Sequence, residues 1–483
     1  MGEVFANPLV ELAEFSDMKQ ALDQGKGPVQ ICGVTDSQKV HTAYELSRDK
    51  AWRLVVTYDD TRAREIYDDL CYFEKNTWLY PARDLLFYNS DIHGNLLTRQ
   101  RMQVFRHLLE DEGGVVVTTV DGLMDHLLPL DELKGRCLFI EAGNILDMDR
   151  IKEELRDMGY ERTGQVDGMG QFSVRGGILD VFPLTEELPV RIELWGDEVD
   201  SIRSFDPESQ RSVAQMEAVL LYPAAELAVS EERITDGIVK IEKDAKKQEK
   251  LFREQKKAEE AHRIHQIVKE LCEGLREGFE VSGLDGYIRY FCDKTVSFLD
   301  YMKEKGAAVI LDEPQRLKEK SETVEAEFRE SMEHRLEKGY LLPGQADLLF
   351  SARAVLAAVQ LPEAVFMTGL DQRLPGMTVK NKYSITGKNV NSYQNSFEIL
   401  IKDLSRWKKE GYRVVLLSAS RTRASRLAGD LREYDLRAFC PDDAGRTVAP
   451  GEILVTYGKL HKGFEYPLIK FVVITEGDMF GNE

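Results

Sequence analysis

Apolar residues recur along this chain with two different periods, and the changes of period mark out separate folding units. Between residues 27 and 130, short β-branched runs such as Val29 to Val34 and Leu54 to Thr57 alternate with longer amphipathic stretches. Two of these, Lys39 to Leu46 and Arg62 to Phe73, carry apolar residues at helical spacing. Because such alternation places successive strands parallel, it predicts an α/β domain whose helices cover a parallel sheet.

Between residues 131 and 225 the pattern changes to strand-length alternation interrupted by Gly and Pro. We expect one helix at Met148–Met158, followed by strands within Gln171–Phe182, Pro189–Trp195 and Glu198–Phe205. Short strands with frequent turn residues are typical of antiparallel sheets. The segment is therefore predicted to be a small β-rich domain inserted into the chain.

A third stretch, residues 226–375, begins with Lys- and Glu-rich sequence over 230–283 that predicts a long helix or a helical pair. The strand pattern resumes at Ala307–Leu311, directly followed by Asp312 and Glu313, and a further strand is expected at Val365–Gly369. We interpret this stretch as a helical return to an α/β region.

The last stretch, residues 376–483, again alternates helix and strand and predicts a second, smaller α/β domain. Its expected elements are Phe397–Lys409, Arg413–Leu417, Thr422–Tyr434, Ile453–Tyr457 and Phe471–Thr475. No closing helix is expected after the last strand, which suggests that the natural chain continues past Glu483. The predicted domains are thus 1–130, 131–225, 226–375 and 376–483.

Composition limits the functions that this chain can perform. With 483 residues it exceeds what one core can hold, and its net charge of −20 argues against a broad grip on a phosphate backbone. Any nucleic-acid contact must therefore be local or made by other segments. The six cysteines are far apart, and the N-terminus lacks the features of a signal peptide, so we expect a cytoplasmic protein.

Candidate chemistry begins at residues 33–40, between the first strand and the first helix, where a phosphate-binding loop would lie. Gly33 and Lys39 have the spacing of a G-x-x-x-x-G-K-[ST] loop. However, Gln38 replaces the glycine that lets the backbone curl around a phosphate, and Val40 replaces the hydroxyl that would bind Mg²⁺. Asp36 adds a negative charge to a loop that would receive anions. The loop is therefore predicted to be degenerate.

An ordinary strand-to-helix turn that never held a nucleotide explains the same residues, and both interpretations predict no ATP hydrolysis. Asp312 and Glu313 stand where a P-loop ATPase carries its Mg²⁺-binding acidic pair. Without a working phosphate loop this vestigial pair has no nucleotide to serve, so a strand-end turn is the favoured interpretation. No bound cofactor, no metal and no catalytic residue are expected in this chain.

Several longer motifs carry a resemblance to a known family. The β-rich segment contains Gly170–Pro183, Arg191–Trp195 and Phe205–Arg211, and the last domain contains Gly458–Leu460 followed by Gly463–Pro467. With the order of domains, they resemble the UvrB-like N-terminal region and third domain of the transcription-repair coupling factor family. The resemblance covers essentially the whole chain. It implies a degenerate phosphate loop, whereas the related protein UvrB has a functional one.

The resemblance also implies partners. In the family the β-rich domain binds UvrA, and the matching positions here are Arg175, Arg191 and Trp195. Full-length members bind RNA polymerase, and their motor domains use ATP and Mg²⁺ to translocate on double-stranded DNA. A C-terminal domain masks the β-rich domain in the resting protein. The implied role is a non-catalytic adaptor that recruits UvrA to stalled RNA polymerase for nucleotide excision repair; the alternative is an active UvrB-like or helicase-like ATP-dependent DNA-binding enzyme.

Strand alternation supports the docking role independently of the resemblance. Along Pro189–Trp195 the branched residues face one side, which leaves Arg191 and Trp195 on the other. On the preceding strand Phe172 and Val174 are expected to point inward, with Ser173 and Arg175 outward. Exposed Trp beside Arg is typical of binding hot spots. The alternative is that Trp195 caps a second small core and the arginines merely solvate the sheet.

Three further features are interpreted conservatively. Residues 78–95, with Trp78–Asp84 and Asn95, depart from the aromatic hairpin that UvrB inserts into DNA, which puts damage verification in doubt. His262 and His265 lie one helical turn apart but lack further ligands to complete a metal site. Because Glu is interleaved with Lys throughout 231–280, that stretch is predicted to be a scaffold helix rather than a nucleic-acid arm.

Overall fold

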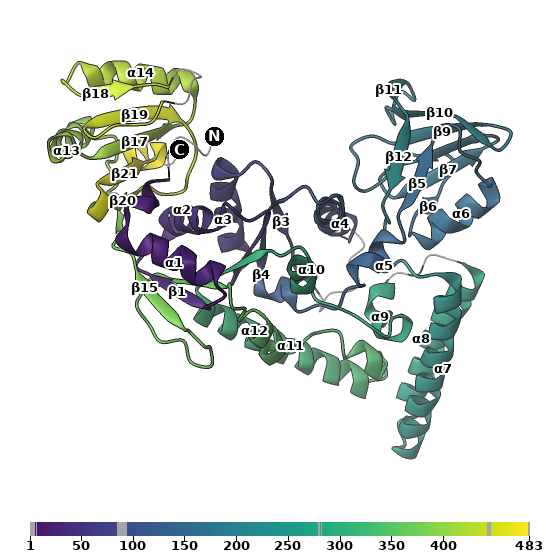
Figure 1. Cartoon of the computed structure of the whole chain (residues 1–483). Helices are drawn as coiled ribbons and strands as arrows, with labels where there is room; N and C mark the ends of the chain where they lie inside the picture. The colour runs from purple at the N-terminus through teal and green to yellow at the C-terminus, as the bar shows by residue number, and fades with distance from the viewer. Residues whose placement is uncertain are drawn as a thin grey trace.

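The chain folds into a large α/β body that carries two further sheet-containing parts and a projecting helical pair (Figure 1). The structure, a computed structural model, describes residues 5, 7–84, 94–278, 281, 283–441 and 446–481. Residues 85–93, which belong to the 78–95 region singled out in the sequence, lie outside the described residues.

The body is built on a seven-stranded sheet in which every neighbouring pair of strands is parallel. In spatial order the strands are β15 (Asn381–Ser384), β1 (Val29–Cys32), β14 (Val365–Thr368), β13 (Ala308–Asp312), β2 (Trp52–Thr57), β4 (Gly114–Thr119) and β3 (Thr77–Tyr80). The predicted parallel α/β sheet is confirmed. Because β13 and β14 lie between β1 and β2, residues 27–130 and 307–369 share one sheet, and β15 joins it from beyond residue 375.

Helices cover both faces of this sheet, as the burial of successive strand residues such as Val55 and Val56 requires. One face is covered by α1 (Ala13–Asp23), α2 (Asp36–Ser47) and α3 (Asp60–Phe73). The other is covered by α4 (Gly94–Glu110), α10 (Phe298–Glu304), α11 (Pro314–Glu337) and α12 (Ala352–Ala358).

The inserted segment forms a six-stranded sheet, as the strand alternation predicts. Its strands in spatial order are β11 (Ser212–Met216), β10 (Glu198–Phe205), β9 (Val190–Trp195), β8 (Ile178–Val181), β7 (Gln171–Arg175) and β6 (Glu161–Arg162). Helix α6 (Met148–Asp157) packs Ile151 and Leu155 against the inner face of this sheet. A two-stranded sheet of β5 (Leu138–Glu141) and β12 (Ala218–Leu221) joins the segment to the body, next to α5 (Leu130–Lys134).

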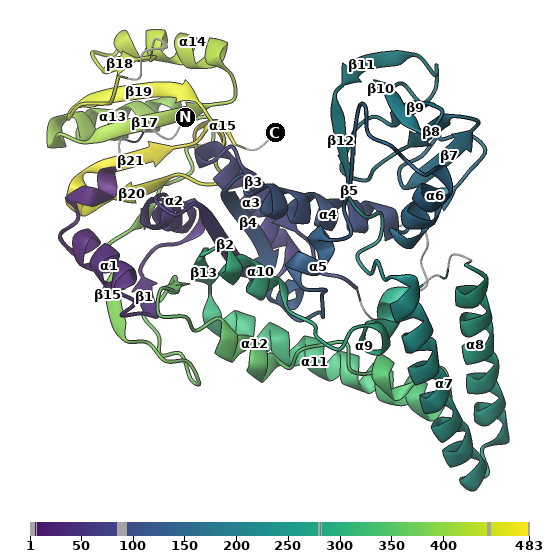
Figure 2. The same ribbon diagram turned by 45° about the vertical axis from the view of Figure 1, so that its right-hand side comes forward.

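The predicted helical pair is found as α7 (Glu231–Glu254) and α8 (Ala258–Glu277). Ile241 and Phe252 of α7 lie in one core with Ile264 and Val268 of α8, so each helix buries one apolar stripe. In both views the pair extends away from the seven-stranded sheet (Figures 1 and 2). Its base contacts α9 (Ile288–Phe291).

The last part contains a six-stranded sheet with two flanking helices. The strands in spatial order are β16 (Lys388–Asn389), β20 (Phe464–Tyr466), β21 (Phe471–Ile474), β17 (Arg413–Ser418), β19 (Glu452–Tyr457) and β18 (Arg437–Phe439). Helices α13 (Phe397–Glu410) and α14 (Arg421–Arg432) pack on one face. Short 3-10 turns complete the chain at Pro8–Glu11, Val120–Leu123, Leu284–Tyr287, Pro343–Gln345 and Pro467–Ile469.

The expectation of no closing helix after the last strand was wrong, because α15 (Glu476–Phe480) follows β21. Thr475 caps this helix: its hydroxyl accepts from the Asp478 amide at 3.1 Å, and the Asp478 carboxylate accepts from the Thr475 amide at 2.9 Å. A helix of five residues is too short to produce a recognisable period in the sequence.

None of the helices in the described part of the chain combines the length and apolar content that a bilayer crossing requires.

Candidate functional site

The outer face of the six-stranded sheet brings two of the predicted docking residues together around one buried carboxylate. Asp180 of β8 lies directly opposite Arg191 of β9 and accepts hydrogen bonds from its Nε at 2.7 Å and its Nη2 at 2.9 Å. Arg175 of β7 reaches the same carboxylate at 3.0 Å. The two arginines therefore share one surface, as strand alternation predicts, and Asp180 fixes their spacing.

The two arginines differ in how firmly they are held. The side chain of Arg191 is only 13% exposed; it also donates to Gln210 at 2.9 Å and lies over the Phe205 ring at 4.3 Å. The hydrogen bond to Asp180 raises the pKa of Arg191. Arg175 remains 47% exposed. Arg191 is thus a rigid, preoriented donor, and Arg175 is the arginine with more surface open to a partner.

Trp195 ends β9 and is 85% exposed. Because α6 packs on the opposite face of the sheet, Trp195 lies on the uncovered side. The alternative in which Trp195 caps a second small core is therefore wrong. Gly196, in the left-handed conformation at φ 64°, turns the chain directly after Trp195 and places the indole at the end of a hairpin.

Sequence reasoning missed a second exposed apolar side chain on the face that carries Trp195. Ile145, in the turn before α6, is 72% exposed and pairs with Glu198, which is itself the partner of Trp195. Directly paired residues of antiparallel strands point to the same face. Ile145 therefore extends the same surface, but it lies in a Gly-Asn turn outside the predicted strands, where no periodicity could identify it.

The predicted outward orientation of Ser173 on β7 is confirmed, but this side chain is covered by a loop. Ser173 is paired with Asp180 and so points to the outer face, but it is only 1% exposed. Its hydroxyl donates to the carbonyl of Gly164 at 2.9 Å, because the loop before β7 folds over it. Ser173 consequently supports that loop and is not available to a partner.

In the predicted degenerate phosphate loop, Lys39 forms ion pairs with carboxylates of this chain. Lys39 is 6% exposed, and its ammonium donates to Asp312 at 2.8 Å and to Glu313 at 2.6 Å. Asp312 also accepts from Thr57 at 2.8 Å and from Arg62 at 3.2 Å. Burial would raise the pKa of Asp312, but Lys39 and Arg62 outweigh it and lower that pKa.

The acidic pair is thus the counter-ion of Lys39 rather than a plain strand-end turn, which corrects the interpretation favoured from sequence. Glu313 additionally accepts from the Gly369 amide at 2.7 Å, which ties the end of β13 to the end of β14. The sequence could not show this network because each of these contacts joins residues at least 250 positions apart.

The residues of this turn with positive φ do not include Gln38. Asp36, at φ 47°, and Gly33, at φ 97°, adopt the left-handed conformation, whereas Gln38 lies inside α2. The Gln38 amide instead donates to the Glu465 carbonyl of β20 at 2.9 Å. Val40 is buried in the core of the body at 3% exposure. The last sheet therefore closes over this turn, with Gln38 as its anchor.

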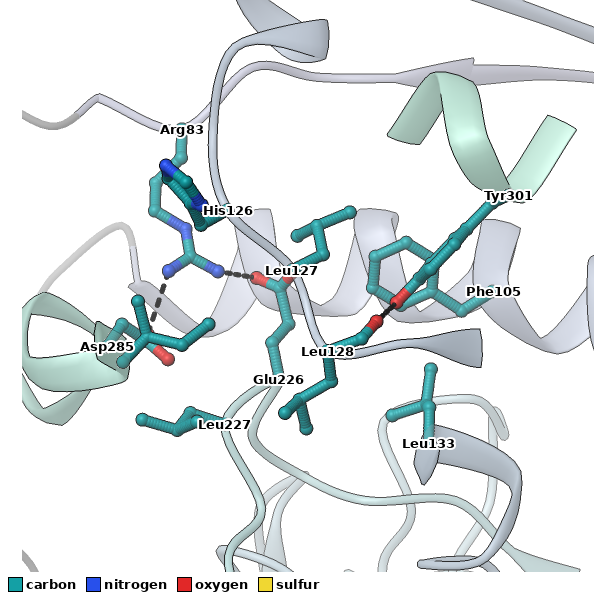
Figure 3. Close-up of a pocket in the computed structure, with 11 residues that line it drawn as sticks. Arg83, Phe105, His126, Leu127, Leu128, Leu133, Glu226, Leu227, Asp285 and Tyr301 are labelled. Atoms are coloured by element: carbon teal, nitrogen blue, oxygen red, sulfur yellow. Dashed lines mark hydrogen bonds and ion pairs between the residues drawn. The ribbon is translucent and has the colours of Figure 1, made fainter. Parts of the chain in front are cut away.

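A largely buried ionic cluster joins the β-rich segment to the body, and Figure 3 shows Arg83, Glu226 and Asp285 of this cluster. Arg101 of α4, which has no exposed surface, donates to Asp125 at 2.6 Å and to Glu226 at 2.9 Å. Arg83 contacts Glu226 as well and reaches Asp285 at 3.3 Å. Burial would raise the pKa of Glu226, but Arg101 and Arg83 lower it. We call these five residues the junction cluster.

The cavity beside the junction cluster is too small for a ligand. Its volume is about 10 Å³, comparable to the space that a single water molecule needs. Leu127, Leu128 and Phe105 line its apolar side (Figure 3). The cluster is therefore a structural joint rather than a binding pocket.

The other residues that the sequence singles out lie in ordinary packing contacts. Trp78 stacks on His107 at 4.1 Å between ring centres, and Tyr80 stacks on Phe298 at 3.8 Å, so neither aromatic is free to insert into DNA. His265 contacts Glu249 at 2.9 Å. Within the described residues, no group of three or more potential ligands is placed to hold a metal ion.

Comparison with known proteins identifies the β-rich segment first. Residues 138–227 match the family described as the UvrB interaction domain, so the fold and its outer face define an α/β protein that carries such a domain. Transcription-repair-coupling factors are similar over nearly the whole chain: the Bacillus subtilis protein is 30% identical over 98% of this chain and 40% of its own length. The Staphylococcus epidermidis protein is 26% identical over 99% of this chain and 40% of its own length.

The Staphylococcus aureus protein is likewise 26% identical over 96% of this chain and 39% of its own length. The resemblance to the transcription-repair coupling factor family is thereby confirmed. The chain spans about 40% of the length of the curated relatives that it matches.

Proposed function

We propose that this chain is a protein-docking segment that recruits UvrA for DNA excision repair through Arg175, Arg191 and Trp195. The observation that carries the proposal is the outer face of the β-rich sheet, where two arginines that share the Asp180 carboxylate lie on the same side as an 85% exposed tryptophan. Preorganised Arg and exposed Trp lose little freedom on binding and are enriched among residues that dominate interface energy. The match of residues 138–227 to the UvrB interaction domain supports a docking role for this segment.

The partner is expected to present carboxylates around an apolar recess. Arg191 uses Asp180 and Gln210 on one side, so an acidic group on UvrA would meet the arginine pair from the open side. Trp195 and Ile145 would enter the recess. The link to stalled RNA polymerase is part of the same proposal and rests on the names of the relatives, which are transcription-repair-coupling factors.

Binding of the 483-residue chain to purified UvrA tests the proposal directly. The double variant Arg175→Glu/Arg191→Glu should lose detectable binding, since reversal of two charges turns attraction into repulsion. The matched control is Arg150→Glu/Arg162→Glu, which makes the same change of charge on α6 and on the far edge strand β6. Normal UvrA binding by the first variant would show that the interface lies elsewhere.

We further propose that the turn at residues 33–40 does not hold a nucleotide, so the chain itself does not hydrolyse ATP. A triphosphate would have to displace Asp312 and Glu313 from Lys39 and bring its own charge beside them. Titration with a fluorescent ATP analogue tests this: no saturable, Mg²⁺-dependent binding is expected. Micromolar binding that is lost in Lys39→Ala would instead favour an ATP-dependent enzyme.

A further inference from the structure

The exposed side of α7 carries a row of lysines on the projecting helical pair. Each of these side chains is exposed, and together we call them the lysine stripe: Lys240, Lys243, Lys246, Lys247 and Lys250. Ile241, Ala245 and Phe252 of the same helix are buried against α8 and its neighbours, so the stripe lies on the opposite side of α7.

The acidic residues interleaved with these lysines are used inside the helical pair. Glu242 accepts from Arg276 of α8 at 2.5 Å, and Asp244 accepts from the Tyr290 hydroxyl at 2.5 Å. Glu249 lies in the groove between the helices, at 15% exposure, and contacts His265 at 2.9 Å. The lysines and the acidic residues that alternate in the sequence therefore lie on different sides of the helix.

Little of the positive charge on the stripe is neutralised locally. Lys240 pairs with Asp293 at 2.9 Å, and Lys250 lies 3.9 Å from Glu254. Among the residues that the structure describes, Lys243, Lys246 and Lys247 form no ion pair. On a chain of net charge −20, these three ammonium groups form a local cationic surface.

We propose that the lysine stripe binds the phosphate backbone of duplex DNA without regard to sequence. Lysine is depleted in protein–protein interfaces, whose energy comes from aromatic residues and arginine, but it is a common contact to phosphate oxygens. The only aromatic residue of α7, Phe252, is buried, so α7 offers no stacking platform of the kind that binds single strands. Duplex phosphate is the partner that fits this composition.

The geometry of the helical pair suits such a contact. The 24 residues of α7 span about 36 Å. Seven residues separate Lys243 from Lys250, about 10 Å of helix, and that length of duplex carries about six phosphate charges. Both views show the pair extending away from the body, where a rod-shaped ligand can approach (Figures 1 and 2). The contact is local, which agrees with the acidic balance of the rest of the chain.

The test measures fluorescence anisotropy of a labelled random-sequence duplex of about 24 base pairs with the 483-residue chain, in about 50 mM salt and upward. The wild-type chain should bind with micromolar affinity. Lys243→Gln/Lys246→Gln/Lys247→Gln should bind at least tenfold more weakly, and the slope of log affinity against log salt should fall by about 2 to 3, since each phosphate contact contributes about 0.9.

The matched control is Lys294→Gln/Lys402→Gln/Lys409→Gln, which removes three exposed lysines from other elements and should bind DNA as the wild type does. Equal weakening in both triple variants would show a general charge effect and overturn the proposal. So would an absence of duplex binding by the wild type in low salt, or equally tight binding to polyglutamate, which would favour an acidic protein partner.

This proposal stands apart from UvrA docking, and the two can fail separately. The stripe variant should keep the circular dichroism melt and UvrA binding of the wild type, whereas Arg175→Glu/Arg191→Glu should keep duplex binding. Loss of duplex binding in that arginine variant, with the stripe variant unaffected, would place the DNA contact on the β-rich sheet and overturn the inference.

Discussion

The carboxylate of Asp180 receives both the Nε and the Nη2 of Arg191, at 2.7 and 2.9 Å, while Asp180 itself is only 1% exposed. Replacing a buried carboxylate that has two arginine partners is costly, because the replacement leaves the buried arginine charge without its counter-ion. Under the proposed docking function, Asp180 would act as a positioning residue, because it holds both arginines on one face of the sheet.

Asp180→Asn should therefore weaken UvrA binding although both arginines keep their charge. The amide cannot accept two charge-assisted hydrogen bonds in the same way, and the loss should lower the free energy of unfolding by about 1.5–3 kcal/mol. Binding and thermal unfolding are measured together. If UvrA affinity is unchanged while stability falls, the arginines do not need Asp180 to be placed, and its role is structural alone.

Trp195→Ala separates binding from folding most cleanly. Since Trp195 is 85% exposed, the unfolding free energy should change by no more than about 0.5 kcal/mol. UvrA affinity should fall by about 2 kcal/mol, roughly 30-fold, as for other aromatic hot spots. Leu370→Ala, at a residue 76% exposed elsewhere on the chain, is the control and should leave affinity unchanged. An equal loss in both variants would remove Trp195 from the interface.

Lys39→Met should destabilise the body without any nucleotide being present. The substitution leaves Asp312 and Glu313 beside each other without their cation, and breaking such a buried pair costs about 3–5 kcal/mol. The double variant Lys39→Met/Asp312→Asn should recover part of that loss, because it removes one uncompensated charge. Thermal unfolding measures both, with exposed Lys409→Met as the control. A Lys39→Met variant as stable as the wild type would contradict the network.

The sequence predicted most local elements because their signals are local. The alternation along β9 predicted that Val190 and Ile192 are buried and that Trp195 is exposed. Apolar residues at helical spacing predicted the α7–α8 pair. The shared sheet could not be predicted in this way, since β13 and β14 enter between β1 and β2 through pairings more than 250 residues apart in sequence. The domain boundaries at 130, 225 and 375 and the roles of the three docking residues stay predictions.

The same difference between local and long-range signals applies to the functional surfaces. The lysine stripe was not predicted, because Glu and Lys are evenly mixed along residues 231–280. Charge composition does not reveal that Glu242 and Glu249 turn toward α8. Ile145 was missed because a turn residue has no period. The acidic pair at Asp312 and Glu313 was found by its position in the sequence, but its partner, Lys39, was identified only by the folded contact.

A contact between His461 and Asp69 holds the last sheet against the body. Asp69 of α3 accepts from the His461 amide at 2.8 Å and contacts its Nδ1 at 2.9 Å, and it also accepts from Ser37 at 2.7 Å. The hydrogen bond to Asp69 raises the pKa of His461 above 6.5. A raised folded-state pKa means that the contact stabilises fully below about pH 6.5 and loses that contribution as the pH rises through the folded-state value.

The thermal midpoint of the wild type should therefore exceed that of His461→Gln more at acidic than at alkaline pH. The imidazole is 38% exposed, so solvent screening keeps the effect to about 1 kcal/mol or less. Glu65 and Asp68 also lie near enough to raise this pKa, which makes Asp69→Asn a useful second variant, expected to lose most of the pH dependence. A constant difference between wild type and His461→Gln across the range would rule out titration of this contact.

The junction cluster leads to a prediction about how the β-rich sheet is oriented relative to the body, not about the surface of that sheet. Arg101 is completely buried and joins Asp125 of the body to Glu226 at the end of the β-rich segment, so Arg101→Met leaves these two buried carboxylates with Arg83 as their remaining cation and should cost about 3–5 kcal/mol. Arg99→Met, on the same helix but partly exposed, is the matched control and should cost less than about 1 kcal/mol.

Arg101→Met should also increase the radius of gyration measured by small-angle X-ray scattering, since the ion pair of Arg101 with Glu226 is a buried link between the β-rich segment and the body. UvrA binding should survive, because Arg175, Asp180 and Arg191 are all held within the sheet itself. Loss of UvrA binding together with an unchanged radius of gyration would show that Arg101 acts on the docking surface and not on the joint.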